Sequence, residues 1–290
     1  MANSKVKNEI ELVGTFKKLA MAYQEIAVIK MQRVRDNVIS TREFLERLSF
    51  VFLDVKKSYK KEIERLLKEK KGGKGLATKY PTNGKTAQVF LASNTKMYGD
   101  IINRLFTFFT ENINNEQSDI VVIGKLGKEL FERKYPGRQY TFFDLPDTGV
   151  TLSDLQKIAV FLVNYDVVEV FYGKFENVAK QNPTVFKITG EEELDSNEDE
   201  EEKKRVGFFF EPSLDTILTF FQDQVFSSLF HQSVSEGELA RFASRIMAME
   251  EALINIEKTE GLLKHQERRD RKLLVNNKQL ERLASYTLWR

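Results

Sequence analysis

Proline and glycine are unevenly distributed along this chain of 290 residues. All five prolines lie from Pro81 to Pro212, and residues 15–71 contain neither proline nor glycine. Since both residue types interrupt helices, we expect long helices at the two ends and turns only in the middle. Helices over residues 5–68 and 213–288 would be roughly 95 Å and 110 Å long at about 1.5 Å per residue, too long for a compact domain.

Apolar residues recur in steps of three and four in both end segments, which is typical of helices that pair. In the first segment the stripe consists of Val6, Ile10, Val13, Phe16, Ala20, Tyr23, Ala27, Met31, Val34 and Val38. In the last segment it consists of Leu239, Phe242, Ile246, Met249, Leu253 and Ile256. Because the middle must close as one domain, the ends are predicted to form an antiparallel two-helix coiled coil.

The seam of the last segment changes character after Ile256. Glu260 and Glu267 occupy positions where the spacing calls for apolar side chains, and residues 265–272 are almost all polar or charged. Two interpretations stay open for this stretch: a solvated helix end, or a charged contact surface for another subunit.

The middle of the chain alternates strand and helix patterns. Strands are expected over 87–93, 119–123 and 166–172, with edge strands over 184–189 and 206–210, and helices over 97–112, from 125, and over 151–164. This order predicts a mostly parallel sheet in a Rossmann-like α/β domain. The predicted organisation is a coiled-coil helix over 1–72, the α/β domain over 73–210 and a second coiled-coil helix over 211–290. An acidic loop is expected over 190–205, since nine of the residues from Glu191 to Glu202 are acidic.

Composition excludes several classes of protein. The 45 basic and 43 acidic residues nearly cancel, so no nucleic-acid partner is expected. The absence of cysteine excludes a thiolate nucleophile and cysteine-ligated metals, and with two histidines, His231 and His265, neither a metal site nor a cofactor is expected. No apolar run approaches the roughly 20 residues that span a bilayer, so no direct membrane span is predicted.

Two glycine motifs invite a phosphate-binding interpretation. Gly84-Lys85-Thr86 resembles the end of a phosphate loop, but Lys79 replaces its first glycine and the triplet precedes a strand. The segment from Gly124 to Gly127 lies at a strand-to-helix turn, where amides can receive an anion. Close packing of helix on strand explains these two glycines equally simply, and no catalytic group of residues emerges.

Several segments, in order, resemble the gamma subunit of F-type ATP synthases over nearly the whole chain. The resemblance covers Ile10 to Met31 (with Val13, Lys18, Ala22, Ile26, Ala27 and Lys30 in place), Val122 to Gly127, Asp166 to Gln181 with Pro183, Glu211 to Ser213, and Arg245 to Ala252 with Asn255. Two segments depart from the family pattern. Ser93 to Asp100 keeps one glycine of three, and Arg271-Lys272 replaces an Arg-Gln pair.

The resemblance implies a central rotor without an active site of its own, which transmits torque between a ring of alpha and beta subunits and a membrane ion-translocating ring. It implies a peripheral position at the cytoplasmic face of a bacterial membrane. The residues expected to contact the alpha/beta ring are Lys17, Lys18, Tyr23, Arg268, Arg271 and Lys272. Those expected in the foot, toward an epsilon-type subunit and the membrane c-ring, are Asn94, Lys96 and Tyr98.

Three alternatives remain at this point. One is the rotor of a divergent F-like ATPase that is not used for ATP synthesis. The second is a structural coiled-coil adaptor, and the third is an α/β enzyme with helical extensions.

Overall fold

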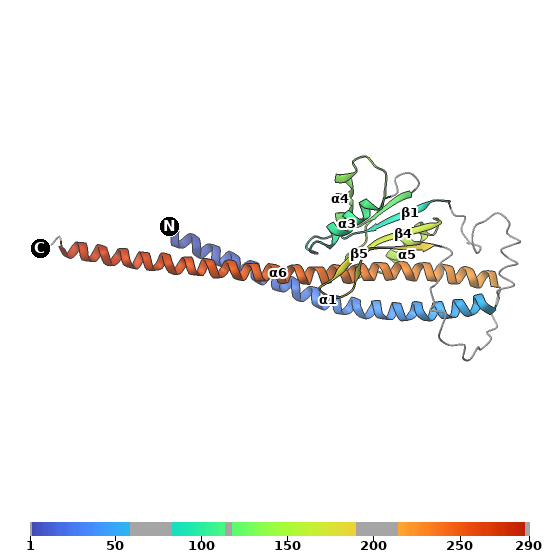
Figure 1. The fold of residues 1–290 in the computed structure, drawn as a ribbon, viewed down its shortest axis with the longest axis horizontal. Coiled ribbons are helices and arrows are strands. Elements are labelled where there is room, and N and C mark those ends of the chain that lie inside the picture. The colour runs from blue at the N-terminus through green and yellow to red at the C-terminus, as the bar shows by residue number, and fades with distance from the viewer. Residues whose placement is uncertain (1, 59–82, 114–117, 190–213, 288–290) are drawn as a thin grey trace. The chain divides into compact units, whose positions relative to one another are not determined.

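A computed structural model describes residues 2–58, 83–113, 118–189 and 214–287. Figure 1 shows the ribbon of the chain, which divides into two compact units. The first unit consists of Met1–Ile29 and Arg245–Arg290, and the second of Lys30–Ser244. The domain boundaries expected after residues 72 and 210, the acidic loop and the strand expected over 206–210 lie outside the described residues.

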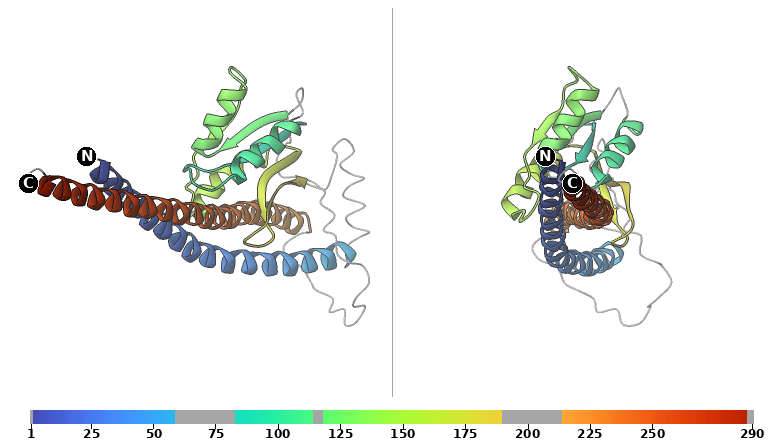
Figure 2. Two further views of the ribbon diagram at one scale, coloured as in Figure 1. Left: turned by 60° about the vertical axis from the view of Figure 1, so that its left-hand side comes forward. Right: turned by 90° about the vertical axis from the view of Figure 1, so that its left-hand side faces the viewer.

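Two long helices run through the ends of the chain, as the sequence predicts. Helix α1 spans Ala2–Ser58 and helix α6 spans Leu214–Thr287. Within the first unit both views of Figure 2 show the start of α1 (dark blue) beside the end of α6 (red). None of the described helices has an apolar stretch that is long enough to cross a lipid bilayer.

The second unit is built on a sheet of five strands in the order β3-β2-β1-β4-β5. The strands are β1 (Thr86–Leu91), β2 (Ser118–Ile123), β3 (Thr141–Phe143), β4 (Val167–Phe175) and β5 (Gln181–Thr189). The first four run parallel, with β1 beside both β2 and β4, and β5 pairs antiparallel with β4. The prediction of a mostly parallel sheet with an edge strand is confirmed, whereas β3 was not predicted.

Three short helices connect the strands: α3 (Ile101–Glu111), α4 (Lys125–Lys134) and α5 (Leu152–Leu162). Helix α5 begins at a capping box, in which the Thr151 hydroxyl accepts from the Asp154 amide and the Asp154 carboxylate accepts from the Thr151 amide. Helix α3 begins four residues later than predicted, because Met97 and Gly99 adopt positive φ angles of 71° and 60° that a helix does not allow.

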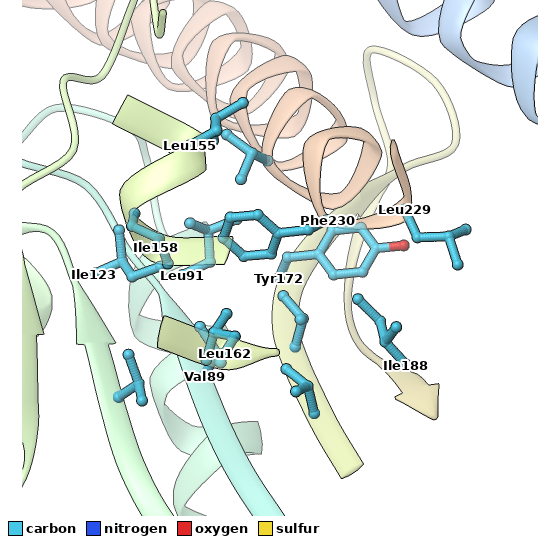
Figure 3. Close-up of a cluster of buried hydrophobic side chains, with 14 of the residues drawn as sticks. Val89, Leu91, Ile123, Leu155, Ile158, Leu162, Tyr172, Ile188, Leu229 and Phe230 are labelled. Atoms are coloured by element: carbon cyan, nitrogen blue, oxygen red, sulfur yellow. The ribbon is translucent and has the colours of Figure 1, made fainter. Parts of the chain in front are cut away.

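The sheet has a buried core on each face. On one face, side chains of α5 and α6 meet those of the strands, and Figure 3 shows Leu155, Ile158 and Leu162 of α5 and Phe230 of α6 clustered with Val89 and Leu91. On the other face Phe109 of α3 stacks on Phe90 with ring centroids 5.0 Å apart and meets Phe171 edge-on at 5.1 Å. Because neighbouring residues of a strand point to opposite faces, Val89 and Phe90 serve different cores.

Candidate functional site

The first unit is an antiparallel coiled coil between α1 and α6. The least exposed positions of α1 follow a three-and-four spacing: Val6, Ile10, Val13, Lys17, Ala20, Gln24 and Ala27. Those of α6 continue the same rhythm past Ile256, through Glu260, Leu263, Glu267 and Asp270. The seam therefore does not stop where its apolar residues end, and it includes polar positions on both helices.

Polar pairs across the seam fix its register. The Lys17 ammonium lies 2.9 Å from the Glu257 carboxylate and 3.8 Å from that of Glu260. One heptad along, the amide of Gln24 donates to Glu250 at 2.6 Å. The hydrogen bond to Glu257 raises the pKa of Lys17. Since these pairs are partly exposed, they contribute more to the choice of register than to stability.

A second apolar stripe lies on the outward side of α1. Leu12, Phe16, Leu19, Tyr23 and Ile26 follow the same three-and-four spacing as the seam, yet each is 40% to 55% exposed. The interpretation that Phe16 and Tyr23 belong to the seam is therefore wrong, since the seam holds Lys17 and Gln24 one position later. Exposed apolar side chains that share one face of a helix are typical of surfaces that bind a partner.

The end of α6 carries the remaining predicted contact residues. Every residue of α6 from 271 to 285 is exposed, and Figure 1 shows this end continuing past the N-terminus of α1. Arg271 and Lys272 begin this stretch, Arg268 is exposed just before it, and Lys18 is exposed on α1. The stretch also exposes apolar side chains, among them Leu273, Leu274, Val275, Leu280 and Leu283.

The carboxyl edge of the parallel strands is where a Rossmann-like fold binds ligands. Here the Asp147 carboxylate accepts the amides of Asn94 and Thr95 at 2.6 and 2.8 Å and the Thr95 hydroxyl at 2.6 Å. The Asn94 side chain accepts the Lys125 amide at 2.8 Å and donates to Asp144 at 2.7 Å. The amides of Asn94, Thr95 and Lys125 are thus occupied by groups of the chain itself.

The two glycines at this edge are needed for close packing. Gly124 has φ of 96°, and a Cβ there would lie 2.8 Å from the Ser93 carbonyl oxygen. A Cβ on Gly127 would lie 2.6 Å from the Ala92 Cβ. Helix α4 therefore sits directly against the end of β1, as the packing interpretation of this motif predicts.

The three residues expected in the foot have different environments. Asn94 is half-buried in the network at the sheet edge. Tyr98 is buried, with its ring edge-on to Phe242 at 6.2 Å. Lys96 is 72% exposed and lies 3.5 Å from Glu129. Lys96 is the most exposed of the three.

Sequence reasoning missed a buried polar network in the second unit, because its members are far apart in the chain. Glu236 of α6 is 3% exposed and receives hydrogen bonds from Arg42 of α1, from Gln232 and from Tyr172 of β4. Nothing in the local sequence around Arg42 distinguishes it from the other charged residues of α1. Among the residues that the structure describes, no group of three or more histidine, aspartate or glutamate side chains could hold a metal ion.

Comparison with known proteins agrees with this architecture. A sequence profile of the family described as ATP synthase matches residues 3–277. The ATP synthase gamma chain of Roseobacter denitrificans is 25% identical over 297 residues, which cover 95% of each chain. That of Pelotomaculum thermopropionicum is 22% identical over 261 residues, or 86% of each chain. The same fold occurs in a solved structure of the Tetrahymena thermophila mitochondrial ATP synthase that contains its central stalk and c-ring. The matching chain has a TM-score of 0.58 and is 17% identical in sequence. The match covers 81% of this chain and 99% of that chain. The chain therefore belongs to the gamma-chain family of ATP synthases.

Proposed function

We propose that this chain is the central rotor of an ATP synthase and transmits torque between a catalytic ring of alpha and beta subunits and an ion-translocating ring in the membrane. The coiled coil of the first unit carries the proposal. Its seam has a fixed register, and its outside combines an apolar stripe with a charged end. The chemical character of this surface therefore differs around the coiled coil. Each subunit of a surrounding ring would contact a different face and be held in a different conformation.

The contacts with the ring are assigned to the outward side of this coiled coil. Lys18 and Tyr23 of α1 and Arg268, Arg271 and Lys272 of α6 are exposed and available to acidic or apolar groups of the ring. Lys17 differs, because it already pairs with Glu257 inside the seam. We assign it a double role, in which it holds the register and presents the rest of its side chain to the ring.

The foot of the rotor is assigned to the second unit. Lys96, together with Asn94 and Tyr98 behind it, is proposed to meet an epsilon-type subunit and the membrane c-ring. Since Tyr98 is buried and Asn94 is held by hydrogen bonds at the sheet edge, they would support the loop over 94–99 and Lys96 would make the contact. In the assembled enzyme the chain would lie peripherally at the membrane, at the cytoplasmic face of a bacterial cell.

Coexpression with the alpha and beta chains of the same source organism tests this proposal. The chain should copurify with them in one complex and rotate during ATP hydrolysis. Charge reversal at Arg271→Glu and Lys272→Glu together should lower the torque, because it places acidic groups against the ring. Lys258→Glu, an exposed lysine within the paired part of α6, is the matched control and should retain the torque.

Failure of the complex to form would refute the rotor function. A chain that instead associated only with itself would indicate a structural coiled-coil protein. Unchanged torque in the double charge reversal would remove Arg271 and Lys272 from the contact surface and leave the rotor function standing.

A further inference from the structure

Glu236 is the centre of a buried polar network that joins three elements of the second unit. One of its carboxylate oxygens accepts from Nη2 of Arg42 at 2.7 Å, from Nε of Arg42 at 3.1 Å and from the amide of Gln232 at 3.1 Å. The other oxygen lies 3.4 Å from the Tyr172 hydroxyl. Burial raises the pKa of Tyr172, so its hydroxyl stays protonated and donates. Helix α1, helix α6 and strand β4 thus share one carboxylate.

Helix α6 is seated closely on the sheet around this carboxylate. A Cβ on Gly237 would lie 3.2 Å from Leu91 Cδ2, and a Cβ on Gly173 would lie 3.3 Å from the Ala240 Cβ. Figure 3 shows Tyr172 beneath α6, beside Leu229 and Phe230. Dense packing of this kind leaves α6 little freedom to move against the sheet.

Helix α1 is packed less completely at the same level. Next to Arg42, a cavity of about 500 Å³ separates α1 from α5 and α6. It is lined by Ser40, Thr41 and Phe44 of α1, and Phe44 is 45% exposed. Val38 and Leu45 of α1 are buried, so α1 also has apolar contacts, but these do not fix the orientation of one side chain against another.

The Arg42–Glu236 ion pair supplies the directional contact that this packing lacks. Arginine is planar and here donates two hydrogen bonds to one carboxylate oxygen, so the pair fixes both the distance and the orientation of the two side chains. Because Glu236 is 3% exposed, solvent screens the pair little on its side.

We propose that the Arg42–Glu236 ion pair is a mechanical link that makes α1 and α6 turn together in the foot of the rotor, so that Arg42 is a positioning residue for torque transmission. The proposal rests on the rotor function. Torque that enters the coiled coil reaches the second unit along both helices. With the pair intact, α1 bears its share of this load. Without it, α1 keeps its apolar contacts but bears less of this load.

Three variants test this link in the complex with alpha and beta subunits. The chain has no cysteine, so an exposed Arg133→Cys on α4 can carry a bead as the probe. Arg42→Ala removes the link. Tyr172→Phe removes a different hydrogen bond to the same carboxylate and leaves Arg42 in place. Arg47→Ala, at an 83% exposed arginine of the same helix, controls for loss of a charge.

The readout is the angular fluctuation of the bead while the rotor pauses between steps. Packed interiors transmit strain, and two helices that share a load are at most about twice as stiff as one, so Arg42→Ala should raise the variance by up to about twofold. Tyr172→Phe and Arg47→Ala should keep the variance of the parent chain. Should Arg42→Ala fail to fold, Arg42→Lys, which keeps a charge but not the two-bond geometry, should still broaden the fluctuation.

An unchanged variance in Arg42→Ala or Arg42→Lys would overturn the link. Equal broadening in Tyr172→Phe would overturn it too, because general loss of stability would then explain the effect. Failure of the parent chain to assemble or rotate would refute the rotor function instead.

Discussion

Replacing Glu238 by glutamine should stabilise the second unit at neutral pH and leave it unchanged in acid. Glu238 lies on α6 and is 8% exposed. Burial raises the pKa of its carboxyl to about 6 from an ordinary 4.5, and Asp147 adds to this effect, whereas Arg241 and Lys30 oppose it. Ionised Glu238 is therefore a net cost to the folded state.

The sign and size of the pH dependence follow from this raised pKa. Between 4.5 and about 6 the folded chain holds a proton that the unfolded chain releases. The contribution of Glu238 is thus most favourable below pH 4.5 and is lost as the pH rises through about 6. A pKa difference of about 1.5 corresponds to about 2 kcal/mol in the free energy of unfolding.

The free energy of unfolding can be measured by urea titration monitored by circular dichroism. Glu238→Gln should raise the free energy of unfolding by about 2 kcal/mol near pH 8 and by almost nothing near pH 4. Glu111→Gln, at an exposed glutamate that ends α3, is the control and should change stability little at either pH. Equal effects of Glu238→Gln at both pH values, or destabilisation near pH 8, would refute the reasoning.

Two further substitutions test the packing of the fold. Gly127→Ala should destabilise the chain by about 1–3 kcal/mol, since its Cβ would lie 2.6 Å from that of Ala92. Gly261→Ala on α6 meets nothing within 4 Å and should stabilise its helix by about 0.5–1 kcal/mol. Thermal unfolding of both variants checks the opposite signs. Phe109→Ala empties a fully buried site between Phe90 and Phe171 and should cost about 3–5 kcal/mol in denaturant unfolding.

The helices and most strands could be predicted because their signals are local. Absence of proline and scarcity of glycine indicate the long helices, and short, mostly apolar runs indicate the buried strands β1, β2 and β4. Strand β3 was not predicted, because it has only three residues and all of them are half-buried. Its run of apolar residues is too short to distinguish a strand from a loop. Its place beside β2 follows from tertiary packing.

The local sequence of α1 does not predict which of its residues form the seam of the coiled coil. On α1 two stripes satisfy the same spacing one position apart, and hydrophobicity favours Phe16 and Tyr23 over Lys17 and Gln24. The structure places the polar pair inside, because Glu257 and Glu250 face them from a helix more than 200 residues away. A single helix sequence does not contain that information.

The sheet edge explains why a Rossmann-like unit here serves a mechanical purpose. In nucleotide-binding relatives of this fold the amides at the strand ends receive phosphate. In this chain the Asp147 carboxylate already takes the amides of Asn94 and Thr95, and Asn94 takes that of Lys125. A phosphate would have to displace a negative charge held by three hydrogen bonds, the third from the Thr95 hydroxyl. These same bonds connect the loops after β1 and β3 to the start of α4, so the groups that elsewhere bind a ligand here hold these loops and this helix together.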